Sequence, residues 1–215
     1  MLAGMPLGVT QWKQVFRERA KAARKEAASR QPNAGQHAAS AFMMAFGEEL
    51  EGSTPASHQG DGVSEPKKVA LYHPKGDELD TEPLADALSK RGIAVLLPVV
   101  EKRGERLRFR LFEIDKGLEK GPFGIMQPPE SCPLGIPDIV VTPLLGVRRD
   151  GARLGMGGGY YDRTLEWLRK SGDVIAIGYG YAAQKMERFP VGPEDQFLDG
   201  FVSEQGFERF PKRPA

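Results

Sequence analysis

The run of glycines between residues 155 and 159 is the feature that most restricts how this chain can fold. The segment reads Arg153-Leu154-Gly155-Met156-Gly157-Gly158-Gly159-Tyr160-Tyr161-Asp162-Arg163. Its glycines let the backbone turn N–H groups inward, where a Cβ would obstruct them. Apolar residues then repeat at helical spacing, which predicts a helix over 162–170. Because a concave glycine nest at a helix N-terminus binds anions, we expect a phosphate-binding loop here rather than a flexible linker.

Charged side chains surround this predicted loop. Arg153 and Arg163 bracket it with positive charge, and Asp162 falls in the first helical turn, where a phosphate-bound Mg²⁺ would find a carboxylate. The loop lacks the Gly-Lys-Ser/Thr ending of a Walker A sequence, and Tyr160 stands where dinucleotide-binding loops have glycine or alanine. The residues alone therefore predict an oligophosphate bound together with magnesium.

The composition is that of an ordinary globular protein. The 215 residues are 40% hydrophobic and 27% charged, with a formal net charge of +1, and this length predicts a single domain spanning 1–215. The near-neutral charge argues against bulk binding to nucleic acid or membrane. The single cysteine, Cys132, excludes an intrachain disulfide and suits a reducing compartment. We expect a cytoplasmic monomer that acts on small molecules.

Hydrophobic patterns alternate along the chain between helical and strand spacing. Two helices are predicted over 12–30 and 34–51, and residues 52–66 contain so little to bury that we expect a mobile surface loop. Further elements are apolar strands at 68–72, 93–97, 138–143, 174–178 and 200–203, a half-exposed strand at 107–111, and helices at 84–88 and 162–170. The alternation predicts a three-layer α/β/α fold with a mostly parallel, Rossmann-like sheet and ligands at the carboxyl ends of its strands.

Four cations of the first predicted helix fall on one face, at steps of four, four and three residues: Lys13, Arg17, Lys21 and Arg24. The apolar side of the helix, with Trp12 and Phe16, would face the other way. A charged helix face is usually only solvated. Beside a phosphate loop, however, such a stripe is a candidate phosphate contact.

The full glycine-rich string resembles the loop of the 5-formyltetrahydrofolate cyclo-ligases, also called 5,10-methenyltetrahydrofolate synthetases. Their pattern, Gly-x-Arg-Leu-Gly-x-Gly-x-Gly-Tyr-Tyr-Asp, is matched at every fixed position from Gly151 to Asp162. This family converts 5-formyltetrahydrofolate to 5,10-methenyltetrahydrofolate with ATP and Mg²⁺. The resemblance implies the same reaction here, in which ATP phosphorylates the formyl oxygen and N10 closes the ring, giving ADP and phosphate.

The resemblance assigns ATP to the glycine loop and to the N-terminal helix. The family's Lys-x-x-x-Arg pair falls on Lys13 and Arg17, although Lys21 and Arg24 offer a competing basic pair. The ATP-binding residues that this implies are Lys13, Arg17, Arg153, Leu154, Gly155, Met156, Gly157, Gly158, Gly159, Tyr160 and Tyr161. Arg153 and Arg163 are expected to act catalytically by neutralising charge on the transferred phosphoryl group.

The resemblance assigns folate to the same loop and to a polar turn that follows the first strand. Glu78 and Thr81 match the family's Glu-x-x-Thr that holds the pterin, and His73 would form a pocket wall. The substrate-binding residues that this implies are Arg17, His73, Glu78, Phe123, Met156, Gly157, Gly158, Gly159 and Tyr160. Magnesium is expected on Asp162 and Asp195, although a surface acid with no ligand is an equally simple interpretation of Asp195.

The chain departs from the family pattern at positions that leave questions open. Arg148 stands where an aspartate is common, and Met156 and Gly158 occupy loop positions where some relatives have lysine or arginine. Phosphate charge would then fall more heavily on Arg153, Arg163 and the N-terminal cations. Whether Arg148 compensates is not decided by the sequence.

Two other classes of function stay open as alternatives. Some proteins carry this domain beside an RNA-binding module and act through RNA, but this chain has no RNP-like aromatic motif and little net charge. A sugar-phosphate isomerase or deacylase of similar α/β build would need no ATP. Dependence of turnover on nucleotide therefore separates that class from a cyclo-ligase.

Overall fold

The computed structural model describes residues 8–51, 67–113 and 115–211, so the loop predicted at 52–66 lies outside the described residues. The helices are α1 (Val9–Arg30), α2 (Ala34–Glu51), α3 (Glu82–Ser89), α4 (Tyr160–Ser171) and the short 3-10 turns η1 (Pro122–Gly124) and η2 (Ala182–Gln184). The main sheet contains β1 (Lys68–Ala70), β2 (Ala94–Val99), β3 (Arg108–Leu111), β6 (Leu134–Gly135), β7 (Ile139–Thr142), β10 (Ile175–Tyr179), β11 (Gly200–Ser203) and β12 (Gly206–Arg209). Two small hairpins pair β4 (Glu119–Lys120) with β5 (Met126–Gln127), and β8 (Gly146–Val147) with β9 (Arg153–Leu154).

The strands of the main sheet lie in the order β12-β11-β10-β7-β1-β2-β3-β6. The five central strands, β11 to β2, are parallel, and antiparallel partners flank them on both sides. Counted along the chain, the parallel strands have the 2-1-3-4-5 order of the flavodoxin-like doubly wound fold, with its switch point between β1 and β7. The predicted α/β fold with a mostly parallel sheet is confirmed, including the parallel pairing of β1 and β2.

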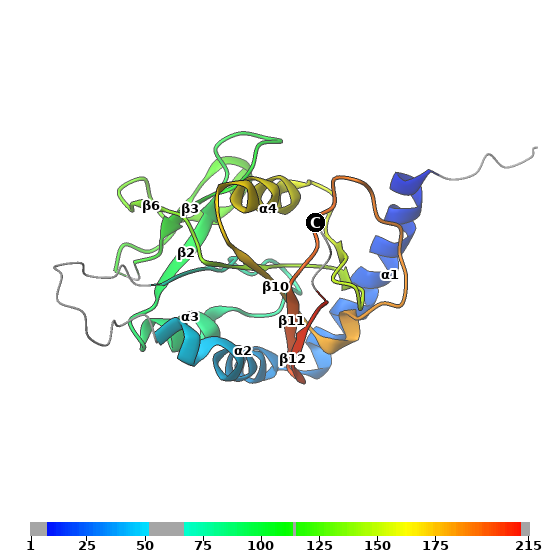
Figure 1. The fold of residues 1–215 in the computed structure, drawn as a ribbon, viewed down its shortest axis with the longest axis horizontal. Coiled ribbons are helices and arrows are strands. Elements are labelled where there is room, and N and C mark those ends of the chain that lie inside the picture. Colours follow the sequence, from blue (N-terminus) through cyan, green and yellow to red (C-terminus); the bar gives the residue numbers. More distant parts are fainter. Residues whose placement is uncertain (1–7, 52–66, 114, 212–215) are drawn as a thin grey trace, which may run out of the picture.

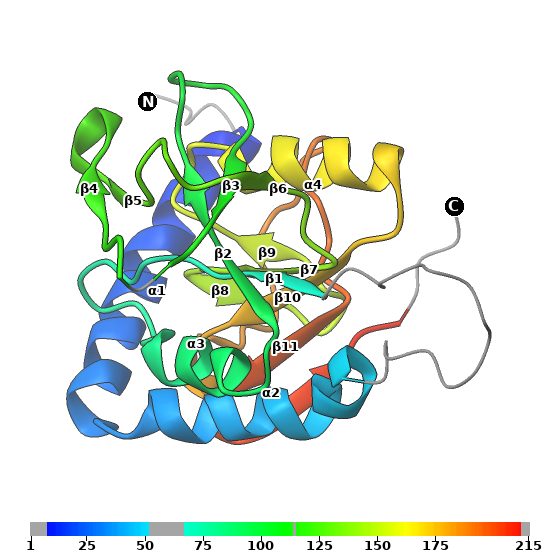
Figure 2. The same cartoon turned by 90° about the vertical axis from the view of Figure 1, so that its left-hand side faces the viewer.

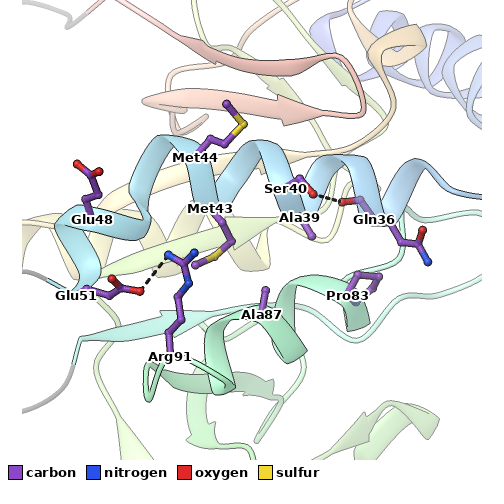
Figure 3. Close-up of a pocket in the computed structure, with 10 residues that line it drawn as sticks. All are labelled: Gln36, Ala39, Ser40, Met43, Met44, Glu48, Glu51, Pro83, Ala87 and Arg91. Atoms are coloured by element: carbon purple, nitrogen blue, oxygen red, sulfur yellow. Dashed lines mark hydrogen bonds and ion pairs between the residues drawn. The ribbon is translucent and has the colours of Figure 1, made fainter.

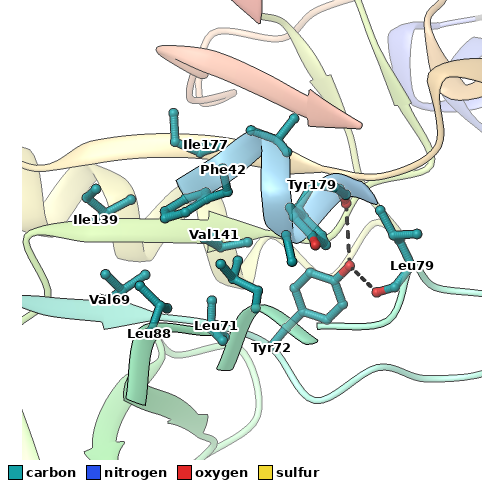
Figure 4. Packing of buried hydrophobic residues seen from close by; sticks show 14 of the residues in the cluster. Phe42, Val69, Leu71, Tyr72, Leu79, Leu88, Ile139, Val141, Ile177 and Tyr179 are labelled. Carbon is teal, nitrogen blue, oxygen red and sulfur yellow. Dashed lines mark hydrogen bonds between the residues drawn. The ribbon is translucent and has the colours of Figure 1, made fainter. Parts of the chain in front are cut away.

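Helices cover both faces of this sheet. Figures 1 and 2 show α2 and α3 together on one face and α4 on the other. On the first face, Phe42 of α2 and Leu88 of α3 pack over Val69, Val141 and Ile177 in one buried cluster (Figure 4). Burying these side chains away from water stabilises the pairing of helix and sheet.

The opposite face of the sheet carries the residues next in sequence to those strand residues. Ala70, Val140 and Ala176 belong to a second buried cluster that includes Leu165 and Leu168 of α4. Successive strand residues point to opposite faces, so strands that are apolar throughout are buried on both sides. This arrangement explains why the predicted central strands read as continuous apolar runs.

The helix α1 buries only part of the side predicted to be apolar. Phe16 and Ala20 pack against Leu145 and Leu154, beside the β8–β9 hairpin, whereas Trp12 is 46% exposed. The expectation that Trp12 belongs to the buried apolar side is therefore wrong. Within the described residues, no helix combines the length and apolar character needed to cross a membrane.

Candidate active site

A cavity of about 700 Å³ opens at the carboxyl ends of the central strands. Residues that follow three parallel strands line it, among them His73 after β1, Val100 after β2 and Leu144 after β7. The switch point between β1 and β7 thus lies at its floor, which is where doubly wound sheets bind ligands. We call this space the loop cavity, because every residue of the glycine loop from Arg153 to Asp162 lines it.

The glycine loop connects the β8–β9 hairpin to α4 through two left-handed backbone positions. Gly157 has φ 101° and Gly159, the N-cap of α4, has φ 66°, and both conformations are costly for residues with a Cβ. Space is also limiting. A Cβ at Gly157 would lie 3.2 Å from the guanidinium of Arg17, and one at Gly159 would lie 2.5 Å from Arg163 Nη1. The sequence therefore needs glycine here to bring bare backbone and cations together.

The basic stripe of α1 faces this loop with three of its four cations. Lys13, Arg17 and Arg24 line the loop cavity, whereas Lys21 makes an ion pair of 2.9 Å with Glu18 on the same helix. Arg17 Nε donates a 2.9 Å hydrogen bond to the carbonyl oxygen of Gly155. The competing basic pair is thus divided, with Lys21 outside the cavity lining and Arg24 inside it.

The two aspartates expected to bind metal each hold a cation of the site. Asp162 Oδ1 accepts a 3.0 Å bond from Arg153 Nη2 and a 3.2 Å bond from the Gln196 amide. Asp195 Oδ2 accepts bonds from Lys13 Nζ and from a backbone amide. Both carboxylates line the loop cavity. Each aspartate is therefore paired with a neighbouring cation through one carboxylate oxygen, and its other carboxylate oxygen takes no part in these bonds.

Glu78 lies at another part of the loop cavity, where it is largely buried. Its Oε2 accepts a 2.9 Å bond from the Lys75 amide, and its Oε1 lies 3.5 Å from Arg24 Nη1. Burial raises the pKa of Glu78 above its ordinary value of 4.5, and the Lys75 amide and the Arg24 guanidinium oppose this rise. Burial likewise raises the pKa of Tyr72 and of Tyr161, and the charge of Glu78 adds to both shifts. Both phenols therefore stay protonated beside the carboxylate at neutral pH.

Three further residues singled out by the sequence, Arg163, Thr81 and Arg148, are absent from the lining of the loop cavity. Arg163 Nη2 donates a 2.8 Å hydrogen bond to the Gly158 carbonyl and so braces the loop. Its expected catalytic role stays a prediction. Thr81 is buried and donates to the Tyr72 carbonyl, so it supports the turn that carries Glu78.

Arg148 also has a structural role. Its guanidinium pairs with Asp150 and donates a 2.8 Å hydrogen bond to the Phe189 carbonyl, so it braces the turn of the β8–β9 hairpin. The side chain of Phe123 lies outside the described part of the chain, and its expected contact with folate stays a prediction.

Most residues that sequence reasoning missed are apolar. Pro98, Leu107, Ile125 and Met126 line the loop cavity, but nothing in their local sequence distinguishes them from core residues. Arg24 is different, since its position on the basic stripe marked it as a candidate. Its burial beside Glu78 depends on how α1 docks, which the local pattern does not report.

A second cavity of about 780 Å³ lies between α2 and α3 (Figure 3). Its polar groups bond one another, as in the 3.0 Å pair of Arg91 with Glu51 and the bond from Ser40 to the Gln36 carbonyl. It contains no glycine nest and none of the residues expected to bind substrate. The loop cavity is therefore the candidate active site.

The fold and this site define an enzyme of the doubly wound α/β class whose cavity joins a glycine-rich loop, flanked by cations, to a buried carboxylate. The chain belongs to the 5-formyltetrahydrofolate cyclo-ligase family, whose profile matches residues 9–204. It is 37% identical over 130 residues to the 5-formyltetrahydrofolate cyclo-ligase of Haemophilus influenzae, covering 58% of this chain and 68% of that protein. It is 34% identical over 141 residues to that of Escherichia coli, covering 63% and 76%.

Solved structures agree with this membership. The 5,10-methenyltetrahydrofolate synthetase of Aquifex aeolicus matches with a TM-score of 0.63 at 27% identity, over 91% of this chain and 95% of that one. The synthetase of Mycoplasma pneumoniae matches with the same TM-score of 0.63 at 21% identity, over 89% and 98%. The second likeness concerns the fold alone.

Proposed function

We propose that this protein converts 5-formyltetrahydrofolate to 5,10-methenyltetrahydrofolate in a ligase reaction that consumes ATP, requires Mg²⁺ and releases ADP and phosphate. The observation that carries the proposal is the convergence of the glycine loop, the α1 cations and the buried Glu78 on one cavity. Family membership over residues 9–204 supports the same reaction. A single cavity that holds both substrates is what direct transfer of a phosphoryl group between them requires.

ATP activates an oxygen that is otherwise a poor leaving group. The formyl group on N5 is an amide, and its carbonyl oxygen does not leave when N10 attacks the carbon. Transfer of the γ-phosphoryl group to that oxygen gives an iminium phosphate, N10 adds to the carbon to close a five-membered ring, and phosphate departs with the oxygen. The protein needs to align the two substrates and neutralise developing charge, and we assign no general base.

The glycine loop and its cations form the nucleotide side of this proposal. Loop amides would donate to the phosphates, and Arg153, Lys13 and Arg17 would supply positive charge around them. Hydrogen bonds to charged groups contribute about 1.5–3 kcal/mol each. Arg153 is the residue we assign to the transferred phosphoryl group, because it is buried at the base of the loop.

The donor set suits magnesium bound as a complex with ATP. Asp162 and Asp195 each keep one carboxylate oxygen that accepts no hydrogen bond within the described residues. No group of three acidic, histidine or cysteine side chains that could hold a metal occurs in the described ranges. Two carboxylates completed by phosphate oxygens and water is a usual environment for Mg²⁺. When bound, Mg²⁺ would neutralise charge on the phosphate oxygens.

The folate side of the proposal is built around Glu78. Its carboxylate would accept hydrogen bonds from the pterin, while His73, Met156 and Tyr160 would line the rest of the folate site with Phe123. Arg17 lies against both the loop and the cavity, so it would contact both substrates. We further infer a cytoplasmic setting, which the single, buried Cys132 supports.

The test follows the near-ultraviolet absorbance of methenyltetrahydrofolate as purified protein meets 5-formyltetrahydrofolate, with and without MgATP. We expect product only when both ATP and Mg²⁺ are present, with one ADP formed for each product molecule. Turnover of a sugar phosphate without nucleotide would favour the isomerase-like class instead. Tight RNA binding at physiological salt without folate turnover would favour the non-catalytic RNA-associated class.

A further inference from the structure

Arg24 is a buried cation whose hydrogen-bonding capacity is mostly unused. The residue is 8% exposed, and within the described structure its Nε and Nη1 atoms have no hydrogen-bond partner. Nη1 has only a long ion pair of 3.5 Å with Glu78 Oε1, and Nε has no acceptor among the described residues, so these buried donors have gained little for the water they have lost. Arg24 lines the loop cavity, so a ligand in that cavity is the natural acceptor for these donors.

The surroundings of Arg24 define which part of a ligand it would meet. Its Nη1 lies 3.5 Å from Glu78 Oε1, and both side chains line the loop cavity. The other titratable groups that face Glu78 are Lys75 on its own turn, Tyr72 after β1 and Tyr161 of α4. The cavity wall therefore presents acceptor oxygens next to guanidinium donors.

We propose that Arg24 is a specificity-determining residue that donates a hydrogen bond to the 4-oxo oxygen of the pterin ring, beside Glu78. This inference rests on the proposed function, because it takes the folate to be the ligand and Glu78 to hold its pterin. One edge of a 2-amino-4-oxo ring offers, in order, a 2-amino donor, an N3–H donor and an O4 acceptor. A carboxylate followed by a guanidinium offers the complementary order of acceptor, acceptor and donor.

This pairing separates a 4-oxo ring from a 4-amino ring. Glu78 accepts from the 2-amino group in either case, but it also accepts from the N3–H of the 4-oxo ring and would face the bare N3 of the 4-amino ring. It therefore supplies a part of the preference that does not depend on Arg24. A 4-amino group would direct its own donors at a guanidinium, which has donors only, and both sets would be left unsatisfied. Sites that hydrogen-bond one group reject the analogue that lacks it, because their buried polar atoms then have no partner.

The experiment compares two ligands that differ only at this position, folic acid and 4-amino-4-deoxyfolic acid. Their dissociation constants are measured by fluorescence titration without ATP, so that no turnover interferes. The wild-type protein should bind folic acid more tightly, by about tenfold or more. In Arg24→Gln the preference should shrink to the part that Glu78 supplies, because a carboxamide can rotate to donate to an oxo group or accept from an amino group.

Two further variants make the outcome specific. Arg24→Lys keeps a cation that only donates, so it should retain a preference for folic acid. Lys25→Gln removes the neighbouring, exposed cation of α1 and should bind both ligands as the wild type does. Thermal unfolding of each variant identifies any that fails to fold, and Arg24→Met then serves as a replacement whose preference should also be smaller than that of the wild type.

Every outcome bears on one proposal or the other. A preference as large in Arg24→Gln as in the wild type, a preference reduced equally in Arg24→Lys, or a wild-type protein without preference would each overturn the role of Arg24. If the preference depends on Arg24 as expected but no methenyltetrahydrofolate forms with MgATP, the proposed reaction fails and the binding inference stands. If methenyltetrahydrofolate forms with MgATP but the wild-type protein shows no preference for folic acid, the role of Arg24 fails and the proposed reaction stands.

Discussion

At the scale of single residues, the site is organised by pairs of opposite charge. Arg153 and Asp162 form a 3.0 Å pair whose side chains are 5% and 20% exposed. Such a pair leaves an uncompensated charge when one member is removed. Its two members are also assigned to different tasks, one to the phosphoryl group and one to the metal. Substitution of either residue should therefore lower the stability of the fold and should also lower kcat through the lost phosphoryl or metal contact.

We expect Asp162→Asn to lower kcat by at least about a hundredfold, because the metal loses a carboxylate ligand while the side-chain shape is kept. The absorbance assay measures kcat, and circular dichroism should show a cooperative thermal transition as in the wild type. Glu166→Gln on the exposed side of α4 is the matched control, since it also removes one acid from that helix. An Asp162→Asn enzyme as active as this control would contradict the assignment.

The charge of Glu78 should make the stability of the protein depend on pH. Its pKa in the folded state is raised above 4.5, chiefly by burial, so the folded protein holds this proton more tightly than the unfolded chain does. The unfolding free energy contributed by this group should therefore fall as pH rises from about 4.5 through the raised pKa. In Glu78→Gln this part of the pH dependence should vanish.

Urea unfolding at a series of pH values from about 4 to 7 measures this dependence. The informative quantity is the difference between wild type and Glu78→Gln at each pH, because the other titrating groups then cancel. A difference that is constant over the range would contradict the raised pKa. A difference that changes in the wild type's favour with rising pH would show a lowered pKa instead.

At the scale of elements, the glycine loop and the first turn of α4 act as one unit. Gly159 combines a left-handed φ of 66° with a neighbour, Arg163 Nη1, that would lie 2.5 Å from an added Cβ. Gly172 at the other end of the same helix has an extended backbone and open space around it. The two glycines therefore differ in both conformation and crowding.

We expect Gly159→Ala to destabilise the protein by about 1–2 kcal/mol, the usual cost of a left-handed non-glycine residue. The KM for ATP should also rise, because the loop amides are displaced from the phosphates. Urea denaturation and steady-state kinetics measure the two effects. Gly172→Ala should change neither, and equal behaviour of the two variants would show that the conformation of Gly159 is not required.

The same scale shows what the sequence could and could not predict. The ranges 12–30 and 34–51 were close to α1 and α2, because long helices repeat their pattern over several turns. The buried side of α1 was predicted only in part, since Phe16 and Ala20 pack against the β8–β9 hairpin while Trp12 stays exposed. The two-residue strands β8 and β9 are too short to carry any periodic signal.

The candidate site divides in a similar way. The glycine loop and its flanking charges were predictable, because a backbone nest requires a particular local sequence. The hydrogen bond from Arg163 to the Gly158 carbonyl, the entry of Arg24 into the cavity and the apolar wall around Leu107 were not. These features depend on how distant elements dock, and local spacing carries no information about that.

At the scale of the whole molecule, the site is assembled from segments far apart in the chain. Lys13 on α1 pairs with Asp195, 182 positions later, at the rim of the loop cavity. In the proposed reaction Lys13 contacts phosphate and Asp195 contacts magnesium. The side chain proposed to contact phosphate is therefore paired, without ligands, with the side chain proposed to bind magnesium.

We expect Lys13→Met to bind Mn²⁺, used as a probe for Mg²⁺, more tightly than the wild type when no nucleotide is present, because Asp195 is released from its ion pair. The same variant should bind ATP more weakly. Isothermal calorimetry measures both affinities, with Lys25→Met as the control on α1. Unchanged metal affinity in Lys13→Met would mean that the ion pair does not compete with the metal.

Lys13 pairs with Asp195, and Arg153 pairs with Asp162. These two ion pairs affect whether the protein binds free nucleotide or its metal complex. In the proposed reaction, phosphates that attract Lys13 and Arg153 would free Asp195 and Asp162, and a divalent ion bound by these aspartates would free the two cations. Each ligand would thereby raise the affinity for the other by the same factor. Such reciprocity favours binding of the preformed complex of nucleotide and divalent ion over binding of either one alone. Nucleotide without bound metal should therefore compete poorly with MgATP, even when it is abundant.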